Sequence, residues 1–337
     1  MTGIACTAAV TACAAVLLAL PSATVSPKEG GMLLVANKGD QSISIVDPAS
    51  GREVGTVAES GVTGHEVAAS PDGRTAWVPI YGNSGVGSPG TDGQSLDVID
   101  LEGRTRIATI AFPGPARPHC AVFGPDGRLY VSSELTNTIA VIDPKSRKIV
   151  DSIPTGQPES HMLAITKDGR RAYTSNVHAG TVSAIDLSAK KVLAVIPISK
   201  VAQRIALSPD DRHAFTADQT APQLAVIDTA TNTVKSWISL PGIAYGTQAT
   251  PDGRWLIVAL INVNKVGVID LSAMKLVRTI DVQRAPQEVL VRPDGHVAYI
   301  SCDISRKIAE LNLTTWTVDR YITVGKGADG LAWAVSP

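Results

Sequence analysis

The sequence predicts an all-β fold, a single seven-bladed β-propeller with four antiparallel strands per blade. One unit, made of short alternating runs separated by turns, recurs along the chain. Its first turn recurs as SPDG at Ser70, GPDG at Gly124, TKDG at Thr166, SPDD at Ser208, TPDG at Thr250 and RPDG at Arg292. Strand-rich copies bounded by Gly, Pro, Asn and Asp indicate propeller blades rather than paired helices.

The period of the repeat can be measured at the position six residues before the turn proline or its equivalent. This position holds His65, His119, His161, Gln203, Tyr245 and Gln287, and Asp329 is its counterpart in a last, shortened copy. From His119 onward each step is 42 residues, whereas the first step is 54, so the first full copy carries an insertion of 12. The copies account for residues 28–337, which predicts one domain.

Residues 1–27 contain an apolar stretch, residues 8–20, followed by small residues. This pattern is typical of a secretory signal peptide, so we expect a secreted or periplasmic mature protein. A membrane anchor is the alternative, but the run is short for a span of about 20 apolar residues. We therefore expect no membrane span in the mature chain.

The ends of the domain predict how the ring closes. Residues 32–37 match the second strand of a repeat, and residues 330–337 match a first strand. We expect the C-terminal strand to complete the blade begun by three N-terminal strands. Such closure covers sheet edges that would otherwise invite pairing with other chains.

The full unit reads PDG-R-x-h-Y/W-V-x-N, a Gly-bearing loop, and S-V-I-D followed by K-V and I-P-V/T-G. Over residues 31–337 it resembles the YVTN-type repeat of YncE-like seven-bladed β-propellers. The resemblance implies the fold. Related propellers include binding proteins, lactone-acting enzymes and redox-enzyme subunits whose channels hold metals or cofactors, so the resemblance does not choose a function.

Composition excludes some functions. The formal net charge is −1, so no basic field exists to bind nucleic acid. Few aromatic residues argue against a stacking platform for sugars or single strands. Cys120 and Cys302 are expected to be buried free thiols, and the protein is expected to be a monomer.

In such a blade the first strand lines the central channel, and the residue at the measured period begins it at one mouth. His65, His119, His161 and Asp329 then occupy four consecutive blades. Three imidazoles with an oxygen donor suit Zn, Cu or Fe. Two alternatives stay open: a pocket for a small ligand without metal, and structural histidines that each bond a neighbour.

Further polar residues fall on the same face. Glu134, seven residues after a turn glycine, is predicted to be a fourth ligand or a general base. Its alternative is a salt bridge with Arg117 or Arg204. The candidates for ligand contact are Tyr81, Glu134, Asn176, His178, Gln203, Arg204, Tyr245 and Gln287.

The 12-residue insertion, within residues 81–93, lies between the second and third strands of the His65 blade. It is expected to project over the same mouth. Long loops on a rigid scaffold are often functional, so this one predicts a lid with Tyr81 at its base. A flexible ornament is the alternative.

Three functions are consistent with these patterns. The first is an exported protein that binds a metal ion or small molecule at the channel mouth. The second is a metal-assisted hydrolase such as a lactonase, a lyase or an oxidase, in which Glu134 or Asp329 acts beside the histidines. The third is a scaffold for other proteins.

Overall fold

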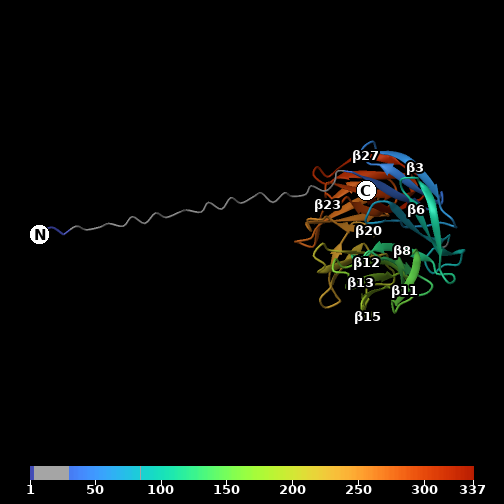
Figure 1. Cartoon of the computed structure of the whole chain (residues 1–337), viewed down its shortest axis with the longest axis horizontal. Helices are drawn as coiled ribbons and strands as arrows, with labels where there is room; N and C mark the ends of the chain where they lie inside the picture. The colour runs from blue at the N-terminus through green and yellow to red at the C-terminus, as the bar shows by residue number, and fades with distance from the viewer. Residues whose placement is uncertain (4–29, 84) are drawn as a thin grey trace.

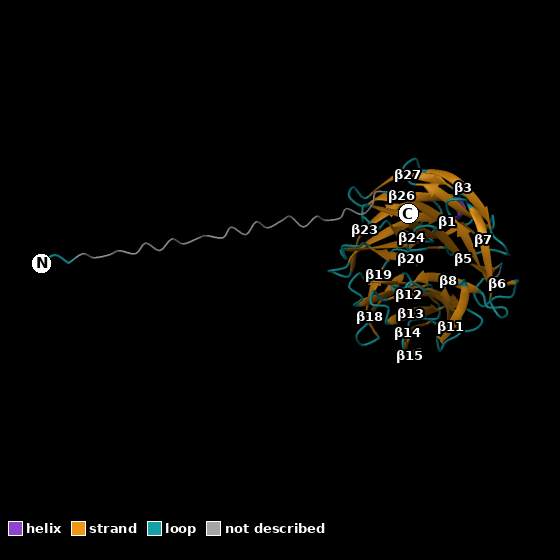
Figure 2. Cartoon of the chain, in the orientation of Figure 1, coloured by secondary structure: helices purple, strands orange, loops and turns teal. Residues whose placement is uncertain are grey.

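The computed structural model describes residues 1–3, 30–83 and 85–337. They form seven four-stranded antiparallel sheets arranged as a ring, which confirms the predicted seven-bladed β-propeller (Figures 1 and 2). Most of the predicted signal peptide falls on residues 4–29, which lie outside the described residues. Within the described part of the chain, no helix is long and apolar enough to cross a membrane.

Each blade runs from an inner strand at the channel to an outer strand at the rim. In Figure 1, β8, β12 and β20 lie around the middle of the disc, whereas β3, β15, β23 and β27 lie towards its edge. The inner strands are β28 (Ala328–Val335), β4 (Ala68–Ala69), β8 (Pro118–Phe123), β12 (Ser160–Ile165), β16 (Ala202–Leu207), β20 (Ala244–Ala249) and β24 (Pro286–Val291). The second strands are β1 (Gly31–Asn37), β5 (Thr75–Gly82), β9 (Leu129–Ser133), β13 (Arg171–Asn176), β17 (His213–Asp218), β21 (Trp255–Leu260) and β25 (Val297–Cys302).

The remaining strands complete the blades. The third strands are β2 (Ser42–Asp47), β6 (Asp92–Asp100), β10 (Thr138–Asp143), β14 (Thr181–Asp186), β18 (Gln223–Asp228), β22 (Lys265–Asp270) and β26 (Lys307–Asn312). The outer strands are β3 (Arg52–Ala58), β7 (Thr105–Ala111), β11 (Lys148–Pro154), β15 (Lys191–Pro197), β19 (Thr233–Ser239), β23 (Lys275–Asp281) and β27 (Thr317–Thr323). One 3-10 turn, η1 (Asp303–Ser305), follows β25.

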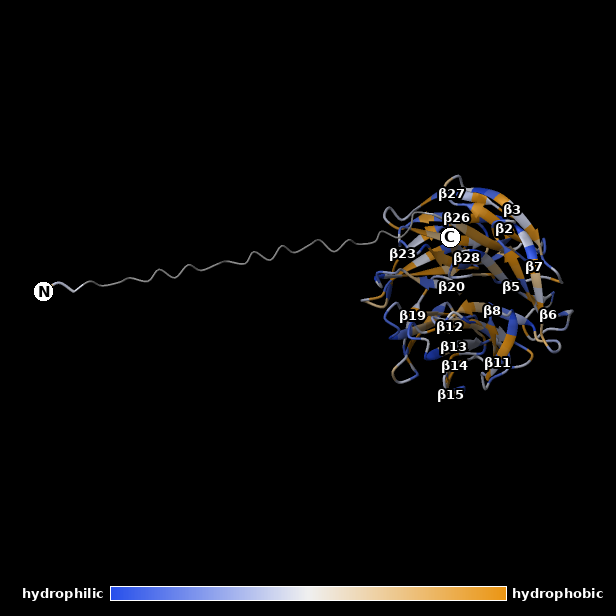
Figure 3. Ribbon diagram, in the orientation of Figure 1, coloured by the Kyte–Doolittle hydropathy of each residue, from blue (hydrophilic) through white to orange (hydrophobic). Residues whose placement is uncertain are grey.

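Burial follows from face-to-face packing of neighbouring blades. Third strands such as β14 are buried at four consecutive positions, because both faces contact other blades. Outer strands such as β15 alternate between exposed and partly buried residues, because one face meets solvent. Figure 3 shows mixed hydrophilic and hydrophobic colour on the outer strands β3 and β27.

The repeated turns stabilise the face opposite the predicted mouth. In the turn at Ser70, the Ser70 hydroxyl donates to Asp72 (2.6 Å) and accepts from the Thr75 amide (2.9 Å). Gly73 has φ +70°, a conformation that glycine adopts without steric cost. The Asp residues that end the third strands cap the next turn, as Asp47 does for Ala49.

The ring closes as predicted. β28 pairs with β1 over residues that include Leu33 with Trp333 and Leu34 with Ala332. Cys120 and Cys302 are both buried and free, as expected.

Candidate ligand site at the channel mouth

The ring position predicted from the repeat lies at one mouth of the channel. A cavity of about 350 Å³ there is lined by six of its seven members, His65, His119, His161, Gln203, Tyr245 and Asp329. The seventh, Gln287, is buried beside the cavity and accepts from Lys38 (3.4 Å). Residues 42 or more positions apart therefore converge, as the repeat requires.

The three histidines form one contiguous group. The rings of His119 and His161 stack with centroids 3.5 Å apart, and the His65 ring meets His119 edge-on at 5.4 Å. Tyr81 packs against all three, at 4.7, 5.1 and 5.8 Å from His65, His119 and His161. We call these four residues the imidazole half of the mouth.

Two imidazole nitrogens in this half lack partners. His119 and His161 are 2% and 3% exposed, and the Nδ1 atom of each is buried without a hydrogen bond. Burial lowers the pKa of both rings, and lowers that of His65 to about 4 against the opposing effect of Asp329. All three rings are therefore neutral at pH 7, which is the form that ligates metals.

Glu134 is clamped beside His161. Its carboxylate accepts from the Tyr81 hydroxyl, the Gly87 amide (3.1 Å) and Arg117 Nη1 (3.1 Å). Its Oε2 lies 3.7 Å from His161 Nδ1, too far for a hydrogen bond. Burial raises the pKa of Glu134, but the nearby His161 and the bonds from Tyr81 and Gly87 outweigh burial and lower it to about 2. So weak a base holds neighbouring groups in place better than it takes up a proton. The predicted alternative, a salt bridge with Arg117, is present.

The strand register shows that counting seven residues after the turn glycine misplaces Glu134 by one repeat position. Ser133, not Glu134, pairs with the inner strand where Asn176 does in the next blade. Glu134 belongs one place later, with Lys38 and Tyr81, whose side chains reach the mouth. The sequence missed this second ring, which consists of Lys38, Tyr81, Glu134, Val177, Gln219, Ile261 and Asp303. Each member directly follows the second-strand residue that pairs with the residue before the ring position.

Below the mouth, Arg204 crosses the channel. Its guanidinium donates to Glu66 (2.5 Å), Glu288 and Asp329 (3.0 Å), which come from three other blades. The group also lies over the Tyr245 ring at 4.7 Å. Arg204 is 3% exposed, and its left-handed backbone (φ 62°) is held by these contacts. We call Arg204, Glu66, Glu288 and Asp329 the Arg204 cluster. Asp329 belongs to the ring itself, and the other three residues directly follow ring residues.

Lys38 joins the cluster to the rim. Its Nζ lies 3.1 Å from Asp329 Oδ2 and 3.4 Å from Asp303 Oδ2. Asp329, predicted as a metal ligand, thus has one oxygen on Arg204 and the other on Lys38. Its pKa is lowered because Lys38 and Arg204 outweigh the effect of burial.

The insertion covers the imidazole half. Gly85 and Val86 line the cavity. Arg117 fastens the loop by donating to the Ser88 carbonyl (2.7 Å) and to Asp92 (2.6 Å). The predicted position over the mouth is therefore confirmed.

The tip of the insertion reaches the His161 blade. A side chain at Gly87 would collide with Glu159 and His178. His178 lines the cavity edge, is half exposed and bonds Glu159 at 2.8 Å. Asn176 lies away from the cavity. Its side-chain oxygen accepts from Ser160 and Thr174, and its side-chain nitrogen donates to Thr181 and Ser183.

The rings do not already form a ligand set. Among the residues that the structure describes, no group of three or more His, Cys, Asp or Glu side chains is arranged to hold a metal ion. His119 and His161 lie face to face rather than converging on a shared point. Binding of one ion by both requires the rings to turn.

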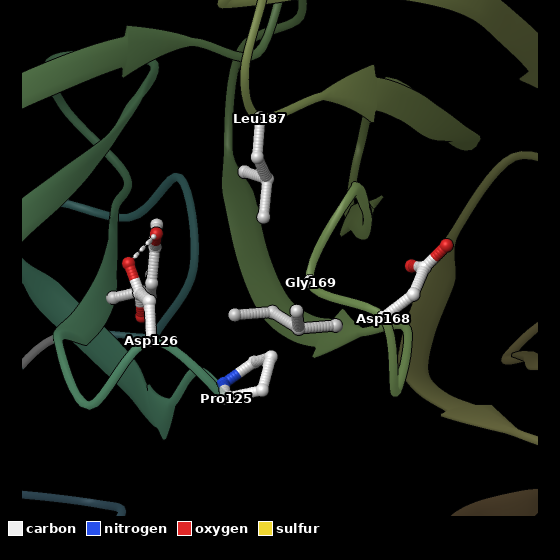
Figure 4. Close-up of a pocket in the computed structure, with 7 residues that line it drawn as sticks. Pro125, Asp126, Asp168, Gly169 and Leu187 are labelled. Carbon is white, nitrogen blue, oxygen red and sulfur yellow. Dashed lines mark hydrogen bonds between the residues drawn. The ribbon is translucent and has the colours of Figure 1, made fainter.

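A second cavity lies on the opposite face between the turns of two neighbouring blades (Figure 4). It measures about 260 Å³, and Asp126 and Asp168 flank it. Asp126 accepts from Tyr130 (2.9 Å), and Asp168 accepts from the Arg170 amide (2.9 Å). These carboxylates are used by their own strands and turns, so this cavity contains no candidate residue.

Comparison with known proteins supports the propeller fold. The sequence pattern of the family described as "Cytochrome D1 heme domain" matches residues 130–250, less than half of the chain. Two solved structures share the propeller, each at a TM-score of 0.73. Hydrazine synthase of Kuenenia stuttgartiensis is 20% identical, and the match covers 87% of this chain and 99% of that chain. A functionally unknown protein from Desulfotomaculum acetoxidans DSM 771 is 14% identical, and the match covers 91% of this chain and 100% of that chain. A search of curated proteins found no match.

The mouth does not fit a haem. Ligand pockets are mostly apolar, whereas charged or amide side chains line much of this cavity, which is also small. The stacked rings of His119 and His161 leave no space for a macrocycle between them. His65, His119 and Asp329 also lie outside the matched residues. These features are consistent with a single ion or a small molecule.

Proposed function

We propose that the protein binds a divalent transition-metal ion at the channel mouth, with His119 and His161 as principal ligands and His65 as the third. The observation that carries this proposal is the pair of buried, unpartnered Nδ1 atoms on neutral rings. Buried polar atoms are nearly always bonded, so two orphans in one cavity wall indicate a missing partner. Zn, Cu and Fe all accept imidazole ligands.

Glu134 supports the proposal through its charge. Glu134 Oε2 lies 3.7 Å from His161 Nδ1, the nitrogen proposed to bind the ion, and Tyr81, Gly87 and Arg117 hold the carboxylate there. A fixed negative charge at this distance favours a cation beside the ring. A bound ion could polarise a carbonyl or acidify a water molecule. Binding rather than hydrolysis is proposed, because Glu134 and Asp329 are both held in ion pairs.

Titration of the metal-free protein with Zn²⁺ by calorimetry tests the proposal. We expect one ion per chain, with affinity reduced at least about tenfold, or 1.4 kcal/mol, in His119→Ala and in His161→Ala. His213→Ala is the matched control, because His213 lies on the opposite face and bonds Lys235 (3.2 Å). Equal affinity in all four proteins, or no stoichiometric binding, contradicts the proposal. Export from the cytoplasm and membership of the YncE-like group stay predictions.

A further inference from the structure

The face opposite the channel mouth carries its charge unevenly, although the formal net charge of the chain is −1. Each blade presents there the turn between its third and fourth strands, and all blades but the closing one also present the turn between the first two. In the blades β8–β11 and β12–β15, these turns span residues 124–128, 143–148, 166–171 and 186–191 and hold nine cations and four carboxylates. The cations, which we call the basic patch, are Arg128, Lys145, Arg147, Lys148, Lys167, Arg170, Arg171, Lys190 and Lys191. In each other blade the corresponding turns hold no more cations than carboxylates, with histidine counted as neutral.

The carboxylates of these turns are held against the backbone. Asp143 accepts from the amides of Lys145 (3.1 Å) and Ser146 (3.3 Å), and Asp186 accepts from the Ala189 amide (2.7 Å). Long cationic side chains therefore extend beyond the short acidic ones. Among the residues that the structure describes, five exposed cations of the basic patch have no side-chain hydrogen bond or ion pair, namely Lys145, Arg147, Lys148, Lys167 and Lys191.

The turns of the two blades form one surface. A Cβ atom on Gly169 would lie 2.7 Å from Pro125 Cγ, so the turns at 124–128 and 166–171 touch (Figure 4). Leu187, which begins the turn at 186–191, lines the same cavity as these two turns. Lys190 Nζ lies 2.5 Å from Asp151 Oδ2 and so links β15 to β11. The basic patch is therefore continuous across both blades.

Exposed aliphatic side chains adjoin the basic patch on the rim. On β11, Val150 follows Lys148 by two residues and is 50% exposed. On β15, Leu193 and Val195 follow Lys191 and are 46% and 40% exposed. Exposed and partly buried residues alternate along both strands, so these side chains face solvent together with their lysines.

The combination of cations and aliphatic side chains indicates the kind of partner. Specific protein interfaces are poor in Lys and rich in aromatic residues, whereas five of the nine cations here are Lys and the adjoining exposed side chains are aliphatic. A soluble polyanion would gain nothing from the aliphatic side chains. At a lipid surface, binding grows with buried apolar area and with attraction to anionic headgroups, so both features contribute there.

We propose that the basic patch, together with Val150, Leu193 and Val195, docks on an anionic phospholipid surface. The contact is peripheral and involves no spanning segment. Because the basic patch lies on the face opposite the channel mouth, docking leaves the mouth on the solvent side. The interaction is independent of the proposed metal site.

Cosedimentation of the full chain with lipid vesicles tests this proposal. The vesicles contain phosphatidylcholine alone or an equal mixture of phosphatidylcholine and phosphatidylserine. Binding to phosphatidylcholine alone measures the contribution of the apolar residues 8–20, which all the proteins share. The quantity compared is therefore the ratio of the affinity for mixed vesicles to the affinity for neutral ones.

We expect this ratio to fall at least about tenfold in Lys148→Gln/Lys167→Gln/Lys191→Gln, because each lysine near an anionic surface contributes to binding. The control is Lys200→Gln/Lys235→Gln/Lys275→Gln, which removes three exposed lysines outside the basic patch and changes the net charge equally. It should bind like the wild type.

A second variant tests the apolar part of the contact. Leu193→Gln/Val195→Gln should weaken binding to mixed vesicles at least about threefold, because less apolar area is buried in the lipid. Both residues are already exposed, so the fold does not depend on them.

Four results overturn this inference. The first is equal affinity of the wild type for the two lipid compositions, and the second is an equal loss in the two triple-lysine variants. The third is unchanged binding of Leu193→Gln/Val195→Gln, which would assign the basic patch to a soluble polyanion. The fourth is tighter binding of polyglutamate than of mixed vesicles at equal charge concentration, which would assign it to an acidic protein.

Discussion

The imidazole half and the Arg204 cluster lie in adjacent layers of one channel, yet they treat buried polar groups in opposite ways. Every member of the Arg204 cluster has an ion pair across the ring, and only Arg204 Nε among the cluster's described side-chain atoms is buried without a hydrogen bond. In the imidazole half, His119 and His161 each keep a nitrogen without a partner. Paired buried charges are costly to disrupt, whereas an unpaired imidazole is free for a ligand. The Arg204 cluster therefore serves stability, and the imidazole half is available for binding.

The largest expected effect is on the Arg204 cluster. Arg204→Met should lower the free energy of unfolding by about 3–5 kcal/mol, because it leaves three buried carboxylates without their shared cation. His119→Phe should change it by less than about 1 kcal/mol, since the lost Nδ1 makes no hydrogen bond. Urea unfolding of both variants measures the difference. Equal losses would remove the distinction between the two layers.

The clamp on the insertion comes next. Glu134→Ala should speed exchange of the Gly87 amide at least about tenfold, because that amide loses its acceptor. Hydrogen exchange measured by mass spectrometry over residues 85–88 checks this. Asp126→Ala, on the opposite face, is the control. Unchanged exchange in Glu134→Ala would show that Glu134 does not hold the insertion.

The pH dependence of metal binding follows from the lowered imidazole pKa values. Ordinary histidines near pKa 6.5 gain protons below that pH and release metal. Because the pKa of His65 is about 4, and burial lowers those of His119 and His161 too, Zn²⁺ affinity should stay nearly constant from pH 8 to about pH 5. Calorimetric titrations at several pH values measure it. A steep loss centred near pH 6.5 would mean that these rings titrate like exposed ones.

The same rings make folding acid-sensitive. The folded state takes up fewer protons than the unfolded chain between pH 6.5 and about pH 4, so the His65 contribution to stability is present above 6.5 and is lost as pH falls. Burial raises the pKa of Glu59 to about 7, which acts in the opposite direction. Comparing the pH dependence of unfolding in wild type and His65→Gln isolates the first effect.

The smallest expected effect concerns two equivalent asparagines. In one blade the Asn176 oxygen accepts from Ser160 (2.8 Å), whereas in the closing blade Asn37 pairs with Ala328 and its oxygen is buried without a partner. Ala328→Ser should restore the bond and raise the free energy of unfolding by about 1 kcal/mol. Ala244→Ser, opposite Leu260, is the matched control and should not stabilise. Equal effects of both changes would refute this explanation.

The repeat predicted the fold, the ring closure and the convergence of His65, His119 and His161, because each depends on a fixed period. It misplaced Glu134, because the turn of that blade is one residue shorter before Tyr130 than the next blade's is before Tyr173. The 42-residue step from His119 to His161 is kept in spite of this shorter turn, so only the strand register reveals the difference.

The Arg204 cluster was missed for a different reason. Its residues Glu66, Arg204 and Glu288 share one repeat position, directly after the ring residues. Reading that position around the ring would have shown opposite charges facing one another. The pairing of each oxygen, and the orphaned Nδ1 atoms, depend on side-chain conformations that a period does not encode.

X-ray absorption of the protein loaded with one equivalent of Zn²⁺ shows directly whether the histidines hold the ion. We expect nitrogen neighbours near 2.0–2.1 Å with the outer-shell scattering of at least two imidazoles, and we expect this signal to be lost in the double variant His119→Ala/His161→Ala. A bound ion surrounded by oxygen alone, or a spectrum unchanged in that variant, would contradict it.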